Sequence, residues 1–127
     1  MKKPSRKEDA FTVIGSNASL EGKLNDSQSV YVEGHLYGDI TTEGEVHIGR
    51  MGFVRGNVKG SAVYIWGKVE GNVEAREVLE IHPGGTLEGD LVTKRLIVHD
   101  GAVFIGRSQM EEVVLQGERE HRTLQAS

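Results

Sequence analysis

The 127-residue sequence predicts an all-β fold, a parallel β-helix (solenoid) of about six coils. A motif of two short apolar segments recurs every 16 to 18 residues. Apolar and polar residues alternate within each segment, which is typical of strands with one buried face. No helical pattern of useful length lies between the segments. Short strands repeated in phase are expected to form coils that stack on one another.

Each repeat reads apolar-x-apolar, a connector of variable length, and then apolar-x-Gly-x-apolar. The repeats in chain order are 12–14 with 20–24, 30–32 with 36–40, 46–48 with 54–58, 63–65 with 69–73, 79–81 with 87–91, and 96–98 with 104–106, where the motif stops. The connectors do not break the phase, so each repeat is expected to form one coil.

Stacked coils place equivalent residues in columns that run along the axis. One interior column is expected to contain Ile14, Val32, Ile48, Ile65, Ile81 and Val98. A second is expected to contain Leu20, Leu36, Val54, Val69, Leu87 and Phe104. The glycines at 22, 38, 56, 71, 89 and 106 form a further column, which is expected to face inward and relieve crowding near a corner.

The β-helix domain is predicted at residues 12–107, between a polar, partly basic N-terminal tail at 1–11 and a polar C-terminal tail at 108–127. Both tails are expected to be flexible. The net charge is -4, and Lys and Arg are spread along the chain, so we expect no nucleic-acid partner. The chain has no cysteine, no transmembrane-length apolar run and no signal-peptide pattern, so we expect a cytoplasmic protein.

The sequence contains no phosphate-binding loop and no catalytic set with a defined spacing, so we assign no catalytic residue, cofactor or nucleotide. Left-handed β-helix enzymes repeat strictly every six residues, and the connectors here break such a frame, which favours the right-handed form. His82 and His99 are expected to stack at a corner. The other members of their column are Glu33, Gly49 and Trp66, too few ligands for a metal, so we predict no metal site.

Four residues share an outward column and form either an ordinary sheet surface or a docking stripe. They are Tyr31, His47, Tyr64 and Ile97.

The run from Val13 to Gly106 resembles the bactofilins, a family of bacterial cytoskeletal proteins, in its period and in phrases such as "VYVEGHLYGDI", "AVYIWGKVEGNV" and "LEIHPGGTLEGDL". The resemblance implies a single-stranded right-handed β-helix. It also implies end-to-end polymerisation without nucleotide, and a role as a scaffold for cell-shape, polarity or envelope-growth factors. In many members an N-terminal segment attaches the filament to the inner membrane, and here that segment is more polar.

Both ends of a β-helix present strand edges and an open apolar core, so we expect a homopolymer formed through both ends. The expected contacts are Phe104, Val103, Ile105, Leu96 and Val98 at the C-terminal end, and Phe11, Val13, Ile14 and Leu20 at the N-terminal end. If each end pairs with its like, the filament has no polarity. Alternatively, the cluster of Met110 and 113–115 forms helical turns that cap the C-terminal end.

The N-terminal basic residues give a possible contact with an anionic membrane, although a solvated tail is the simpler interpretation. These residues are Lys2, Lys3, Arg6 and Lys7. The main function expected is therefore a non-enzymatic scaffold filament. The alternative is a β-helical binding module, or a left-handed β-helix type of enzyme, with a corner metal site.

Overall fold

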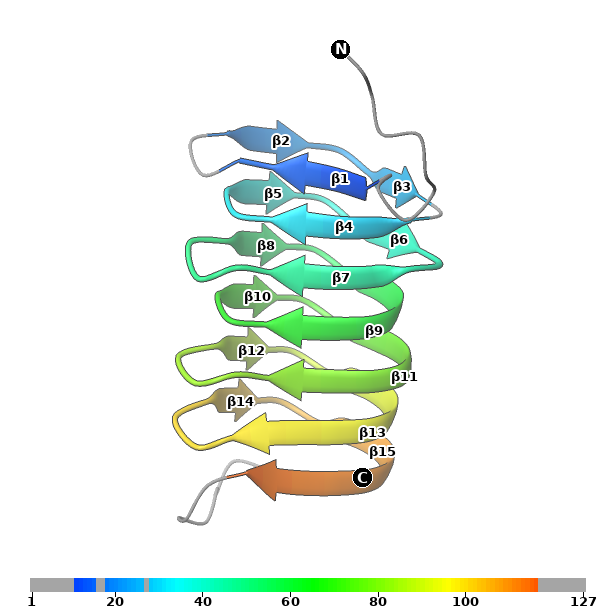
Figure 1. Ribbon diagram of the computed structural model, residues 1–127, viewed down its shortest axis with the longest axis vertical. Coiled ribbons are helices and arrows are strands. Elements are labelled where there is room, and N and C mark those ends of the chain that lie inside the picture. Colours follow the sequence, from blue (N-terminus) through cyan, green and yellow to red (C-terminus); the bar gives the residue numbers. More distant parts are fainter. Residues whose placement is uncertain (1–10, 16–17, 27, 117–127) are drawn as a thin grey trace.

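The computed structural model describes residues 11–15, 18–26 and 28–116, and these residues form a β-solenoid built from parallel strands. Successive coils descend along one axis, and the strands on the near side run opposite to those on the far side (Figure 1). The near strands run to the left and the far strands to the right as the chain descends, so the coil is right-handed. This agrees with the strong right-handed preference of parallel strand connections, and the left-handed alternative is wrong.

The first face of the solenoid is a sheet whose main path contains seven strands, all parallel. In order they are β1 (Phe11–Ile14), β4 (Ser29–Val32), β7 (Glu45–Ile48), β9 (Val58–Ile65), β11 (Val73–Ile81), β13 (Leu91–His99) and β15 (Ser108–Gln116). Two short strands, β3 (Leu24–Asp26) and β6 (Ile40–Thr42), pair with each other, and β6 also pairs with the first part of β9. The same sheet thus bends round a third side.

The second face is a six-stranded sheet of short strands. From the N-terminal end they are β2 (Ser19–Glu21), β5 (His35–Tyr37), β8 (Phe53–Arg55), β10 (Lys68–Glu70), β12 (Thr86–Glu88) and β14 (Val103–Ile105). Each strand pairs in parallel with the equivalent strand of the next coil, as the repeat predicts.

Both predicted interior columns are confirmed by the strand register. In the first column Ile14 pairs with Val32, and the series continues to Ile81 opposite Val98. In the second column Leu20 pairs with Leu36, and the series ends with Leu87 opposite Phe104. These residues are fully buried, apart from the slightly exposed Ile14 and the exposed Leu20 in the first coil. Removal of this apolar surface from water is the main force that holds the coils together.

The solenoid continues past the expected boundary at residue 107. Residues 108–116 form β15, which pairs with β13 over its whole length, so this segment is neither a tail nor a set of helical turns. The rest of the expected tails, residues 1–10 and 117–127, lies outside the described residues.

The glycine column lies at the corner after each second-face strand, but its role differs from the one expected. These glycines have positive φ angles, for example 148° at Gly71, a conformation that side chains rarely adopt. A Cβ added at Gly71 would overlap the carbonyl oxygen of Gly56 in the preceding coil. The glycines are therefore needed because the backbones of successive coils lie very close together along the axis at this corner. They do not serve to make room for side chains in the interior.

Candidate assembly surfaces

The open core at the C-terminal end lies one strand further along than the sequence predicts. Leu96 and Val98 are fully buried because β15 covers them, so neither is a terminal contact in the single chain. Their partners in β15 are Val113 and Leu115, whose exposed fractions are 41% and 43%. Met110, on the same strand, packs partly against the core. Exposed apolar side chains thus lie beside the strand edge at this end.

The Val103–Ile105 triplet does not form one continuous apolar platform. Phe104 points into the core and is fully buried, whereas Val103 and Ile105 are exposed. This alternation follows from the strand itself, because successive side chains point to opposite faces. Phe104 is therefore the last interior residue of the second face in the described part of the chain, and its neighbours lie on the outer surface.

The N-terminal end is formed by β1 and β2, the first strands of the two sheets. Leu20 is 39% exposed although its partner Leu36 is fully buried. Ile14 is buried, and Phe11 and Val13 lie in β1. The first coil thus leaves its second-face core position partly open. The predicted membrane-contact residues, Lys2, Lys3, Arg6 and Lys7, lie outside the described residues.

Aromatic and imidazole rings stack along the outside of the first face, both in the outward column of Tyr31, His47 and Tyr64 and in the corner column of His82 and His99. In one column Tyr31 lies 4.5 Å from His47, and His47 lies 4.9 Å from Tyr64, measured between ring centroids. In the other, Trp66 lies 4.1 Å from His82, and the expected contact of His82 with His99 has a centroid distance of 4.5 Å.

Glu80 contacts both histidines of the second column, His82 and His99. The sequence pattern does not predict this contact. Glu80 occupies the column of Tyr64 and Ile97, but its carboxylate reaches sideways to both imidazoles. Glu80 Oε2 lies 2.6 Å from His99 Nε2 and 3.4 Å from His82 Nε2. Burial lowers the pKa of His82, an effect that Glu80 opposes and that His99 and His47 reinforce.

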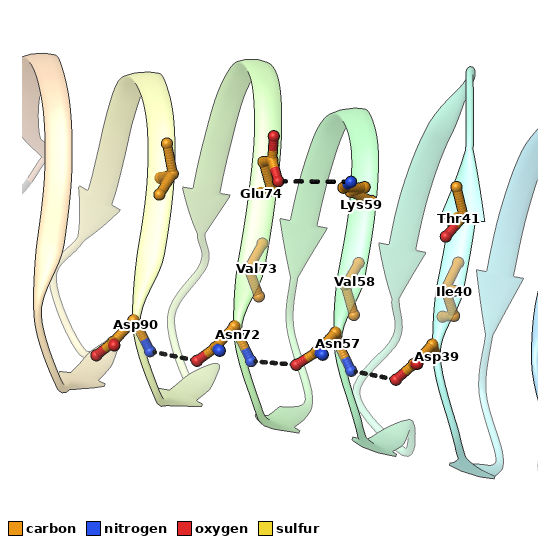
Figure 2. Close-up of a pocket in the computed structure, with 11 residues that line it drawn as sticks. Asp39, Ile40, Thr41, Asn57, Val58, Lys59, Asn72, Val73, Glu74 and Asp90 are labelled. Carbon is orange, nitrogen blue, oxygen red and sulfur yellow. Dashed lines mark hydrogen bonds and ion pairs between the residues drawn. The ribbon is translucent and has the colours of Figure 1, made fainter.

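A row of Asp and Asn side chains follows the glycine column and links successive coils at the corner (Figure 2). The backbone N–H of Asn57 donates to Asp39 Oδ1 at 2.9 Å, and that of Asn72 donates to Asn57 Oδ1 at 3.1 Å. Asp90 and Arg107 continue the series. Each side chain thus supplies an acceptor to a corner N–H of the next coil. The Gly-Asp or Gly-Asn pair, repeated in phase, is the sequence signal for this row.

This row borders a shallow groove of about 540 Å³ along the third side of the solenoid. Val58 and Val73 form part of its floor, and Lys59 forms an ion pair with Glu74 across adjacent coils at 3.8 Å (Figure 2). Both charged side chains are more than half exposed, so the pair is expected to contribute little to stability. Among the described residues, no helix has the length and apolar character needed to cross a membrane.

The family model and the curated relatives that match this chain are all bactofilins. The model of the bactofilin family, described as polymer-forming cytoskeletal, matches residues 12–109. Bactofilin BacP of Myxococcus xanthus is 32% identical over 102 residues, which cover 80% of this chain and 42% of BacP. Bactofilin BacO of the same organism is 28% identical over 102 residues, which cover 80% of this chain and 81% of BacO. The chain thus matches less than half the length of BacP but most of BacO.

Two solved structures are also similar. A cryo-EM reconstruction of Thermus thermophilus bactofilin double helical filaments matches with a TM-score of 0.74 and 30% identity, over 78% of this chain and 98% of that chain. A crystal structure of a mutant of the Thermus thermophilus bactofilin matches with a TM-score of 0.53 and 22% identity, over 84% and 100% of the two chains. The second likeness concerns the fold alone.

Proposed function

The chain belongs to the bactofilin family of polymer-forming cytoskeletal proteins, and on this premise we propose that it assembles end to end into filaments without nucleotide. The observation that carries this proposal is made on residues 11–15, 18–26 and 28–116: at each end of the stack they form, exposed apolar side chains adjoin the edges of parallel sheets. Edges of this kind readily pair with another chain. Burial of these edges and side chains supplies the driving force, so assembly requires no energy source.

The C-terminal contact in this proposal centres on β14 and β15. Val113, Leu115 and Met110 provide the apolar surface of the last first-face strand. Val103 and Ile105 flank the edge of β14, and the buried Phe104 supports that edge from inside. Leu96 and Val98 act indirectly, as the layer on which β15 rests.

The N-terminal contact is formed by β1 and β2. It includes Leu20, whose side chain is already partly open, together with Phe11, Val13 and Ile14 in β1. Each end associates with the same end of another copy, which gives a filament without polarity.

The filament acts in the cytoplasm, at the inner face of the membrane, as a scaffold for cell-shape, polarity or envelope-growth factors. The basic residues near the N-terminus add weak attraction to anionic lipid, about 1 kcal/mol each. These residues are Lys2, Lys3, Arg6 and Lys7. Many copies on one filament make such weak contacts effective together.

The test is electron microscopy of the purified full chain in buffer without nucleotide, comparing wild type with Leu115→Arg. We expect filaments for the wild type and only small oligomers for the variant, because an arginine at this contact would lose its water without gaining a partner. Met51→Arg is the matched control, since Met51 is an apolar residue with 68% exposure in a connector away from both ends. It should leave filaments intact.

Wild-type protein that stays monomeric at high concentration would contradict the proposal. Equal loss of filaments in Leu115→Arg and Met51→Arg would contradict the location of the contact. Circular dichroism must show unchanged β-sheet content in both variants. Leu115 suits this experiment better than Phe104, because Phe104→Arg would also place a charge in the core.

A further inference from the structure

We propose that Glu80, His82 and His99 form a binding site for a divalent transition metal ion, with Zn²⁺ as the best match. The candidate ligand atoms of these three side chains all lie within 4.8 Å of one another. Two imidazoles and one carboxylate are a donor set that proteins use for zinc, with water as the fourth ligand. The site lies on the outer surface of the first face, at β11 and β13, and all three ligands come from one chain, so it does not depend on polymerisation. It is one strand away from the C-terminal strand β15, in which Gln116 pairs with His99.

The distances fit a tetrahedral ion with small adjustments. Two atoms that each lie about 2.0–2.1 Å from a tetrahedral zinc ion are about 3.4 Å apart. His82 Nε2 and Glu80 Oε2 are 3.4 Å apart. His99 Nε2 and Glu80 Oε2 form a hydrogen bond of 2.6 Å, which opens by less than 1 Å when an ion replaces the shared proton.

The two imidazoles must also turn toward each other. Their planes are 16° apart and their centroids 4.5 Å apart, so their nitrogen lone pairs are nearly parallel and must converge on the ion. The side chains of His82 and His99 are 19% and 25% exposed, which leaves room for rotation and an open side for water. The strands beneath them are fixed by the pairing of Ile81 with Val98, so only side chains need to move.

The repeat itself brings these ligands together. Glu80 and His82 are two residues apart, so they point to the same side of the strand. His99 occupies the equivalent position to His82 in the next coil, because the two residues follow the paired positions Ile81 and Val98. A bound ion therefore links two adjacent coils.

A tryptophan next to the proposed site allows metal binding to be followed by fluorescence. Trp66 is the only tryptophan, and its ring stacks on His82 at a centroid distance of 4.1 Å. Ni²⁺ bound to His82 is therefore expected to quench the tryptophan fluorescence, whereas Zn²⁺ is expected to compete with Ni²⁺ and restore it.

The experiment is calorimetric titration of the full chain with Zn²⁺, together with Ni²⁺ quenching of Trp66 and thermal unfolding with and without Zn²⁺. We expect one ion per chain, and a melting temperature that rises with Zn²⁺ because the ion binds only the folded site. Glu80→Gln and His99→Ala should each weaken binding by at least about tenfold. His47→Ala is the control, since His47 faces the same side and pairs with Glu45 but lies outside the cluster.

Binding that is unchanged in both Glu80→Gln and His99→Ala would overturn the proposal, as would equal weakening in His47→Ala. The near-isosteric Glu80→Gln keeps the test valid if His99→Ala unfolds. Filaments should form with or without the metal, so failure of this proposal is distinguishable from failure of the assembly model.

Discussion

At the level of single residues, the corner glycines are fixed by two constraints that can be separated experimentally. Gly71 combines a φ of 148° with close approach to the Gly56 carbonyl. Gly84, in a connector, has a φ of 88° but no atom within 4 Å of an added Cβ. The first glycine is therefore required by both backbone angle and space, and the second by backbone angle alone.

This difference predicts unequal costs for the same substitution. Gly84→Ala should lower the free energy of unfolding by about 1 kcal/mol, the cost of a side chain at positive φ. Gly71→Ala should lower it by more than about 3 kcal/mol, because the two coils must also move apart. Denaturant unfolding of both variants measures the difference. If both variants lose the same free energy of unfolding, neighbouring coils can move apart at little cost.

At the level of the elements, the regular strands follow directly from the sequence, whereas two features do not. Alternation and period identify both interior columns, since one buried face imposes a period of two. The sequence predicts a tail from residue 108 because the two-segment motif does not recur there, although Val113 and Leu115 continue the spacing of Leu96 and Val98 and pair with them in β15. Glu80 was missed because a column assignment gives the direction of a side chain but not its sideways reach.

The Asp and Asn row gives a test of the corner between strands. Asn57→Ala removes the acceptor for the Asn72 N–H and should cost about 1 kcal/mol of stability. Asn57→Asp retains an oxygen in the same place and should cost less. Unfolding midpoints of the two variants provide the measurement, and faster hydrogen exchange is expected at the Asn72 amide in Asn57→Ala alone. A larger loss in Asn57→Asp would argue against the acceptor role.

At the level of the whole molecule, the proposed absence of polarity can be tested by chemical cross-linking, because the chain has no cysteine. Gln109→Cys places a single thiol on β15, at the C-terminal end of the stack. If like ends meet, a bis-maleimide shorter than the rod should join two such chains within filaments. Met51→Cys, on the side of the rod, serves as the control.

In head-to-tail filaments, Gln109→Cys thiols of successive copies would be separated by a full rod, roughly 30 Å for six or seven coils. Absence of cross-linked dimers in filaments that electron microscopy shows to be intact would therefore favour a polar filament. Cross-linking of Met51→Cys to the same extent would indicate lateral contacts instead.

The close backbone approach at the corner glycines also constrains how this rod evolves. Insertion of one residue into a strand would invert its buried and exposed sides and move the glycine away from the only position that it fits. The connectors between the two faces, in contrast, already differ in length from coil to coil. We therefore expect the length of the rod to change in whole repeats, each duplication or deletion altering it by about 4.8 Å.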